Sequence, residues 1–290
     1  MKWVTFNDGG MTRHGYVEGD EIVVTGDGDL TTVVRGDAER TVETRRPLVE
    51  VQLLSPLLTP GKVIAVAANY QEHVKEAGGD ARDQKTATPR LFLKPDTTIT
   101  GPDAPVTLNP ITQQLDWEVE IAAVIGRRAQ AVTTDEALDY VFGYATSNDI
   151  SARSLDLGTA RDDNAWTGFF DWLEGKWLDG SAPVGPYLVS ADEVPDPQDL
   201  GLTLTLNGET MQKGSSTDMV HTVAELVSFS SRLMTLNPGD MILTGTPSGV
   251  GATTGVFLKP GDTMVAEVEG LGRLATPIVA PESRRPMHNQ

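Results

Sequence analysis

Three carboxylates at alternate positions are the residues of this sequence that point most directly to chemistry. Asp116, Glu118 and Glu120 lead into an apolar run, residues 121–125, with the composition of a buried β-strand. Because side chains alternate across a strand, all three carboxylates are expected on one face. Carboxylates this close repel one another and resist burial unless a cation lies between them. The sequence therefore predicts a divalent metal site on this strand.

Asp149 is the third predicted metal ligand, beside Glu118 and Glu120. It stands at the end of another apolar run, and three hard oxygen ligands favour one Mg²⁺ or Mn²⁺ ion over zinc. The alternative is that Glu118 and Glu120 lie on a solvated strand face. Residues 121–125 would be apolar on both faces of a strand, which favours a buried, central strand instead.

His73 and Glu76 have the spacing of an orienting carboxylate and a general base. They are three residues apart, so on a helix they share one face, and the carboxylate can orient the imidazole. The helix is expected to begin near Asn69 and to end at Gly78. Spacing alone leaves open that His73 is a surface histidine beside acidic residues.

Two lysines, Lys94 and Lys176, lie in apolar or glycine-rich settings. Aromatic neighbours of Lys176 favour a partly desolvated ammonium that meets a substrate carboxylate, although a surface lysine with a packed stem fits equally well. Residues 245–251 are rich in glycine and form either an anion-binding turn or a tight bend between strands. They lack the signature of a phosphate loop, and no serine has the context of a nucleophile elbow.

The composition is that of an ordinary globular protein. The chain has 290 residues, of which 39% are hydrophobic, and no cysteine, which excludes disulfides, thiolate metal sites and cysteine nucleophiles. A net charge of −18 without a run of Lys or Arg disfavours nucleic acid and anionic membranes as partners. There is no signal-peptide pattern and no membrane-spanning apolar stretch, so we expect a cytoplasmic protein.

The pattern of elements predicts a β-rich α+β protein with two parts. Residues 1–55 alternate short apolar runs with Asp-Gly pairs, which is typical of hairpins, and predict a small β-rich N-terminal domain. Residues 36–46 are expected to link it to a catalytic domain, residues 56–290. In that domain we expect strands at residues 63–67, 90–94 and 121–125, helices at residues 134–141 and within 217–234, and a polar loop at residues 80–89.

Ordered motifs between residues 60 and 278 resemble the fumarylacetoacetate hydrolase superfamily, in particular its acylpyruvate hydrolases and hydroxy-dienedioate isomerases. The resemblance implies a catalytic domain built as a mixed β-roll or sandwich, with the metal at its mouth, usually as a homodimer. It rests on Asn69-Tyr70 with His73 and Glu76, on residues 92–95, 116–126 and 143–149, and on Gly175-Lys176, Gly185-Pro186, Asn207-Gly208 and residues 243–251.

The resemblance also implies roles for individual residues. Many members of the family read Ala-Arg-Asp after the metal aspartate, whereas this chain has Ser154 in the last position. The segment that follows, residues 156–170, is polar and is expected to help line the pocket, while residues 80–89 correspond to a lid. By resemblance, the metal ligands are Glu118, Glu120 and Asp149, the dyad that activates water is His73 with Glu76, a lysine that offsets substrate charge is Lys176, and substrate contacts are Tyr70, Lys94, Arg153 and Thr246.

The activity implied is catabolic and depends on a divalent metal. The leading hypothesis is hydrolysis of a carbon–carbon bond in a 2,4-dioxo acid of the acylpyruvate or fumarylpyruvate type, with the metal stabilising the enolate that leaves. Alternatives on the same fold are oxaloacetate decarboxylation, isomerisation of 2-hydroxyhepta-2,4-diene-1,7-dioate and dehydration of a 2-keto-3-deoxy sugar acid. A non-catalytic, metal-dependent binding protein is the alternative from a different class.

Overall fold

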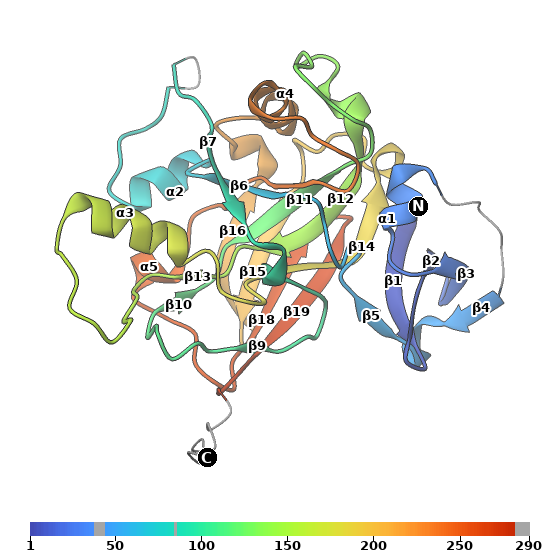
Figure 1. Cartoon of the computed structure of the whole chain (residues 1–290), viewed down its shortest axis with the longest axis horizontal. Helices are drawn as coiled ribbons and strands as arrows, with labels where there is room; N and C mark the ends of the chain where they lie inside the picture. The colour runs from blue at the N-terminus through green and yellow to red at the C-terminus, as the bar shows by residue number, and fades with distance from the viewer. Residues whose placement is uncertain (38–43, 84–85, 282–290) are drawn as a thin grey trace, which may run out of the picture.

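The computed structural model describes residues 1–37, 44–83 and 86–281 (Figure 1). Strands dominate and the helices are short, as the sequence predicts. The elements are β1 (Lys2–Asp8), β2 (Met11–Glu18), β3 (Glu21–Asp27), α1 (Thr31–Arg35), β4 (Thr44–Pro47), β5 (Gln52–Leu54), β6 (Val63–Ala67), α2 (Gln71–Glu76), β7 (Arg90–Lys94), β8 (Ile99–Thr100), β9 (Val106–Thr107), β10 (Leu115–Asp116), β11 (Val119–Ile125), β12 (Val141–Asn148), β13 (Ser151–Ala152), α3 (Ala165–Glu174), β14 (Ala182–Ser190), β15 (Gly201–Leu206), β16 (Glu209–Ser215), α4 (Val223–Leu233), β17 (Met241–Leu243), α5 (Gly251–Thr254), β18 (Thr263–Val268) and β19 (Gly272–Val279).

Two mixed sheets carry the architecture. The larger has 12 strands, and its main path runs β4-β3-β2-β1-β14-β12-β11-β17-β6-β7. The smaller has five strands in the order β16-β15-β18-β19-β9, and β10 pairs separately with β13. Strands β1 to β5 lie on one side of the molecule, while α2 and α3 lie on the opposite side (Figure 1). In the described part of the chain, no helix has the length and apolar character needed to span a lipid bilayer.

Strand β11 is the buried central strand that its sequence predicts. It pairs with β12 on one edge and with β17 on the other, and all seven of its residues are buried. Ile121 and Ala123 pack into the core between the two sheets, whereas Ala122 and Val124 pack into a second cluster on the other face. Apolar residues at successive positions are therefore explained by burial of both faces.

The N-terminal residues form a β-rich unit that continues the large sheet. Trp3 of β1 pairs with Leu188 of β14, so the sheet crosses the predicted domain boundary near residue 55 without a break. The predicted linker is wrong for residues 44–46, because β4 pairs with β3. Gly36 ends α1, and residues 38–43 of that prediction lie outside the described residues.

The helices follow the sequence less closely than the strands do. Helix α2 ends just before Gly78, whose φ of +78° suits a left-handed helix end. The helix expected at residues 134–141 is only a 3₁₀ turn, Ala137–Tyr140, because Val141 already belongs to β12. Helix α4 begins at Val223 rather than earlier, because Thr222 and Glu225 form a capping box.

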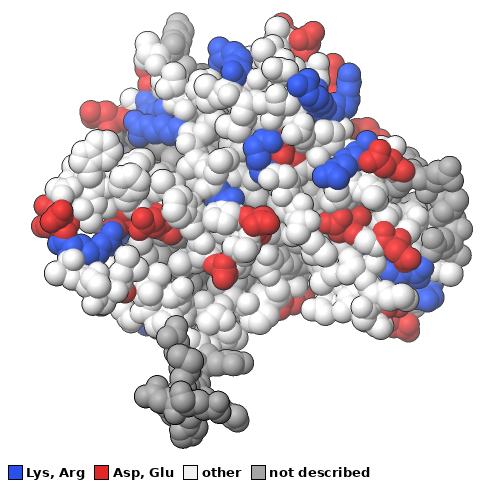
Figure 2. Space-filling model, in the orientation of Figure 1, with Lys and Arg blue, Asp and Glu red and all other residues white. Residues whose placement is uncertain are grey.

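Charged side chains are dispersed over the face of the molecule shown in Figure 2. Figure 2 shows Lys and Arg interspersed with Asp and Glu in small groups, with uncharged residues between them. Among the described residues, Arg45 forms ion pairs with Glu18 and Glu21. On this face, therefore, no continuous basic surface forms that would attract a nucleic-acid backbone.

Asn69 ties together the elements that lead into the site. Strands β6 and β17 are parallel neighbours, and Asn69 follows β6 while Thr244 follows β17. The Asn69 amide donates to the carbonyl oxygens of Thr244 (2.8 Å) and His221 (3.0 Å), and its oxygen accepts from the His221 amide (2.9 Å). These buried bonds fix the start of α2, which carries His73.

We expect Asn69→Ala to lower the free energy of unfolding by roughly 3 kcal/mol, because it leaves buried backbone groups without partners. Urea denaturation measures the loss. The matched control is Asn237→Ala, at an exposed position, which should change stability by less than about 0.5 kcal/mol. Equal effects of the two substitutions would contradict the role given to Asn69.

Candidate metal centre and active site

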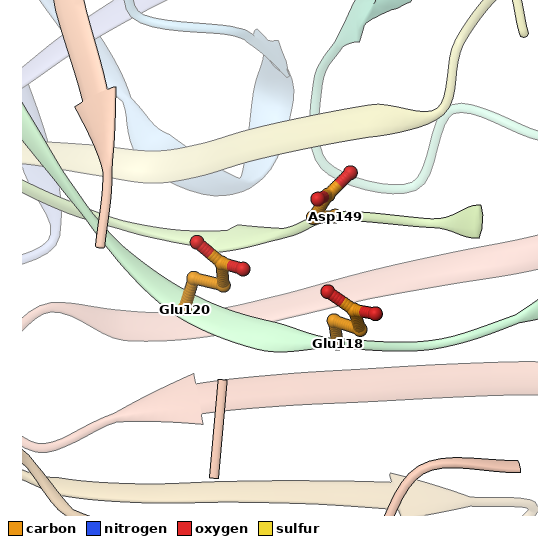
Figure 3. Close-up of side chains that lie close together, drawn as sticks. All are labelled: Glu118, Glu120 and Asp149. Carbon is orange, nitrogen blue, oxygen red and sulfur yellow. The ribbon is translucent and has the colours of Figure 1, made fainter. Parts of the chain in front are cut away.

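Three buried carboxylates converge where β11 and β12 pair. Ligand atoms of Glu118, Glu120 and Asp149 all lie within 4.8 Å of one another, and the side chains point into a shared space (Figure 3). Glu120 belongs to β11, Glu118 directly precedes it, and Asp149 directly follows β12. Antiparallel pairing places Val119 opposite Asn148, so the register of two strands assembles the cluster.

Asp116 lies apart from this cluster, which corrects the expectation of three carboxylates on one strand face. The chain leaves β10 at Asp116 and enters β11 only at Val119. Asp116 accepts hydrogen bonds from the amides of Gly251 (2.5 Å) and Ala252 (2.9 Å) and from Nε of Arg153 (2.8 Å). It is a structural anchor that holds Arg153 beside the metal cluster.

Cations of the protein itself already contact two of the three carboxylates. Nζ of Lys176 donates to Glu118 and to Asp149, each at 2.9 Å, and Arg153 donates to the other oxygen of Glu118 at 2.5 Å. Nζ of Lys94 donates to Asp149 at 2.6 Å. Charge repulsion in this cluster is therefore relieved in part without a metal.

The surrounding charges shift the pKa values of Glu118 and Glu120 in opposite directions. Burial raises the pKa of Glu118, but the charges of Lys176 and Arg153 outweigh it and lower this pKa to about 2. The pKa of Glu120 is raised well above its ordinary value by burial and by the negative charges of Asp149 and Glu118. Glu120 accepts a hydrogen bond from the Gly245 amide at 2.7 Å. Among the described residues, none forms an ion pair with it.

The donor set fits one hard divalent cation. Counting formal charges, four carboxylates (Asp116, Glu118, Glu120, Asp149) face three cations (Lys94, Arg153, Lys176), which leaves one negative charge when all are ionised. The carboxylate oxygens of Glu118, Glu120 and Asp149 each accept at most one hydrogen bond within the described residues and can accept more. Three oxygen ligands suit Mg²⁺ or Mn²⁺, and such an ion would supply the positive charge that Glu120 lacks.

His73 and Glu76 form the predicted pair. Nδ1 of His73 lies 2.8 Å from Oε1 of Glu76, while Oε2 of Glu76 accepts from the Gly249 amide (2.9 Å) and from Thr253 (3.1 Å). Burial would raise the pKa of Glu76, but the hydrogen bonds from His73 and Gly249 outweigh it and lower that pKa. An ionised Glu76 accepts a hydrogen bond from Nδ1–H of His73, so in the neutral imidazole the lone pair is on Nε2.

The glycine-rich segment after β17 binds anions, and these are the protein's own carboxylates. The amides of Gly245, Gly249 and Gly251 donate to Glu120, Glu76 and Asp116 respectively. Gly249 has a φ of +101°, and a Cβ there would lie 2.1 Å from the carbonyl oxygen of Met211, so no larger residue fits. One segment thus positions a metal-cluster carboxylate, the dyad carboxylate and the anchor of Arg153.

Gln212 is a positioning residue that the sequence did not reveal. It comes from β16 of the small sheet, accepts from the Val119 amide at 3.0 Å and donates to the Thr246 hydroxyl at 2.9 Å. Thr246 in turn donates to the Val119 carbonyl at 2.8 Å. No local pattern marks Gln212, because its partner Val119 lies 93 residues away in the chain.

A cavity of about 690 Å³ opens beside these groups. Its lining includes His73, Glu118, Arg153, Lys176 and Thr246, whereas the residues described as lining it do not include Tyr70, Lys94 or residues 80–83 and 86–89. The lid predicted for residues 80–89 stays a prediction, and residues 84–85 lie outside the described residues. The rest of the lining is mostly apolar: Val66, Ala67, Ala68, Arg90, Leu91, Phe92, Leu93, Phe169, Trp172, Leu173 and Trp177.

Two predicted substrate contacts are placed elsewhere. Tyr70 lies in the hydrophobic core, and its hydroxyl has no hydrogen-bond partner within the described residues. Lys94 is fully buried behind Asp149, where it also bonds Ser181. Neither residue is among the described residues that line the cavity, so Tyr70 packs in the core and Lys94 orients Asp149, and their contact with substrate stays a prediction.

Helix α3 forms one wall of the cavity, and the sequence pattern did not predict this helix. Its first turn is capped by Asn164, whose side chain accepts from the amides of Trp166 and Thr167. The segment 156–170 does contribute to the lining, but through Phe169, and Trp172 and Leu173 follow on the same helix. The lining is therefore aromatic where a polar one was expected.

Comparison with known families and proteins gives a consistent result. The family described as "Fumarylacetoacetate (FAA) hydrolase C-terminal" matches residues 62–279, and "Rv2993c-like, N-terminal" matches residues 1–56. The oxaloacetate tautomerase FAHD2A of Bos taurus, a mitochondrial protein, is 36% identical over 264 residues, covering 89% of this chain and 79% of the relative. The 2,4-didehydro-3-deoxy-L-rhamnonate hydrolase of a Sphingomonas species is 36% identical and covers 94% of each chain.

Solved structures agree with the sequence comparisons. The fumarylacetoacetate hydrolase from psychrophilic Exiguobacterium antarcticum superimposes with a TM-score of 0.83 at 34% identity. The match covers 97% of this chain and 100% of that one. The fold predicted from the sequence is thereby confirmed over almost the whole chain.

We expect binding of Mn²⁺ to release a proton and to weaken as the pH falls. The pKa of Glu120 is raised in the metal-free protein, so the ion must displace a proton from this carboxyl, and acid favours the protonated form. Calorimetry in buffers of different ionisation enthalpy counts the protons. Glu120→Gln should abolish the release and weaken binding, while Glu72→Gln on the exposed face of α2 should do neither. An affinity that does not change with pH would contradict the assignment.

Proposed function

Because the chain belongs to the fumarylacetoacetate hydrolase family, we propose that it is a divalent-metal-dependent hydrolase of a 2,4-dioxo acid of the acylpyruvate type. The observation that carries the proposal is the position of His73, which is hydrogen-bonded to Glu76 and lines the same cavity as Glu118 and Lys176. A base oriented by a carboxylate, beside ligands for a hard cation, suits attack by water on a carbonyl. The hydrolase among the relatives supports the same reaction class.

Glu118, Glu120 and Asp149 would hold the ion. When bound, a Mg²⁺ or Mn²⁺ ion polarises the oxygens of a 2-oxo carboxylate and offsets negative charge that develops there. Lys176 and Arg153, fixed by their carboxylate partners, keep positive charge at the same end of the cavity. The substrate head group is thus oriented toward this end and its acyl group toward His73.

His73 would act as the base and then as the acid. Nε2 takes a proton from water as the water oxygen bonds to C4 of the substrate, and Glu76 holds the imidazole in the required tautomer. The C3–C4 bond then breaks, its electron pair goes to C3, and the acyl group leaves as a carboxylic acid. His73 returns the proton to C3, which yields pyruvate, while Lys176 offsets the oxyanion at C4.

Keto–enol interconversion of oxaloacetate is the second candidate. It is favoured by the similarity to the oxaloacetate tautomerase FAHD2A of Bos taurus, which is 36% identical to this chain. The same base would move a proton at C3, without attack by water. Decarboxylation of oxaloacetate, isomerisation of a hydroxy-dienedioate and dehydration of a deoxy sugar acid need the same charged site, since each develops negative charge next to a 2-oxo carboxylate.

A substrate panel with Mg²⁺ or Mn²⁺ decides among these reactions. We expect 2,4-dioxo acids to be cleaved to pyruvate and a carboxylic acid, measured as ultraviolet loss of the enol together with product identification. Faster ketonisation of oxaloacetate without cleavage of any dioxo acid would favour the tautomerase instead. Binding without turnover across the whole panel would point to a non-catalytic binding protein.

We expect His73→Ala to lower kcat at least about 100-fold, because the general base is lost, and to leave Mn²⁺ affinity unchanged. Glu76→Gln should lower kcat less, since the imidazole remains but is held in the wrong tautomer. Glu72→Gln, the same chemical change on the same helix, is the control and should keep the wild-type rate. A near-normal rate for His73→Ala would rule out this role.

A further inference from the structure

We propose that the half of the cavity away from the carboxylates binds a bulky apolar tail of the substrate, preferably an aromatic acyl group. The inference rests on the proposed function for the head group, a 2-oxo acid. The inference adds the class of substrate. We expect a 2-oxo acid that carries an aromatic or long-chain acyl group, where a dicarboxylic acid would carry its second carboxylate.

The lining residues separate by chemistry into two ends. The charged end contains Glu118, Lys176 and Arg153, which are tied to one another by ion pairs. Phe92 begins the other end, since Nζ of Lys176 lies 5.5 Å from the centre of its ring. Beyond it the wall is built from Phe169, Trp172, Leu173, Trp177, Leu91 and Leu93.

The aromatic wall is a packed surface. Phe92 and Trp172 meet edge to face with ring centres 5.2 Å apart, and Phe169 lies 6.0 Å from Trp172. β7 supplies Phe92, and α3 supplies the other two rings. Rings from two elements that face one cavity form a shaped apolar wall that can hold a flat apolar group.

The size of the cavity favours a large ligand. Its volume of about 690 Å³ falls in the range of roughly 300–1,000 Å³ typical of sites for drug-sized molecules. A four-carbon acid held at the charged end would leave most of this space to water beside apolar side chains. Replacing that water with an apolar tail is favourable.

The apolar wall offers few partners for a second carboxylate at the end of the substrate far from the 2-oxo acid. The lining cations Arg153 and Lys176 are already paired. Arg90, at an exposed position of the lining, is the exception, since the described residues include no carboxylate in an ion pair with it. Recognition of a dicarboxylic acid through Arg90 is therefore the specific alternative that an experiment must test.

Helix α3 offers a matched pair of residues for the test. Phe169 lines the cavity and is 51% exposed, whereas its neighbour Phe170 is 44% exposed, stacks on Trp166 and is not among the lining residues described. Both side chains are half out of the core, so loss of either should leave the fold intact. Only Phe169 is placed to contact a tail.

The test measures binding to the Mn²⁺-loaded protein of three 2-oxo acids that lack the 4-oxo group and so cannot undergo the proposed cleavage. By calorimetry, 2-oxo-4-phenylbutanoate should bind at least about tenfold more tightly than 2-oxobutanoate or 2-oxoglutarate. Phe169→Ala should weaken binding of the phenyl ligand about tenfold, and Phe170→Ala, which removes only a ring 5.5 Å from that of Phe169, should weaken it much less.

Three results would overturn the inference: tightest binding of 2-oxoglutarate, equal affinities for the three acids, or no binding of any of them. Equal effects of Phe169→Ala and Phe170→Ala would do the same. Turnover of the matching 2,4-dioxo acids is measured separately. Preference for the phenyl ligand without turnover would support the tail site and contradict the proposed hydrolase. Turnover without that preference would support the hydrolase and contradict the tail site.

Discussion

Burial of negative charge where β11 and β12 pair is the constraint that organises this molecule. Carboxylates lose the solvation of water in the interior, so each must receive hydrogen bonds or a cation there. Lys176 and Arg153 donate hydrogen bonds to Glu118, and Lys94 donates one to Asp149. Backbone amides donate to Asp116. Glu120 receives an amide hydrogen bond and, among the described residues, no ion pair.

The segment after β17 shows how the backbone shares this work. Three of its amides donate hydrogen bonds to carboxylates from different elements. One carboxylate belongs to the metal cluster, one to the dyad, and one anchors Arg153. Because the donors are spaced along one short segment, the metal cluster, the dyad and the Arg153 anchor are held in fixed positions relative to one another. A site assembled in this way needs little reorganisation when a substrate binds, which is what efficient electrostatic catalysis requires.

The cavity joins this charged region to an apolar one. Its charged end is common to every reaction considered for the family, because all of them use a 2-oxo carboxylate. Its other end is lined by side chains of β7 and α3 and by Trp177, and Phe92 of this wall lies beside Lys176. Helix α3 contributes wall residues and none of the three cluster carboxylates, whereas β7 supplies both Phe92 of the wall and Lys94, the partner of Asp149.

The sequence by itself determined the local features: the buried strand at residues 121–125, the strands at residues 63–67 and 90–94, the helix with His73 and Glu76, and the acidic residues that converge. These follow from periodicity and spacing, which act between residues close in the chain. Only the tertiary structure decided that Asp116 is an anchor, that Lys94 lies behind Asp149, that Gln212 reaches Val119 and that α3 makes the wall aromatic. Each depends on contacts between elements far apart in the chain, and no local pattern records which distant side chain satisfies a buried polar group.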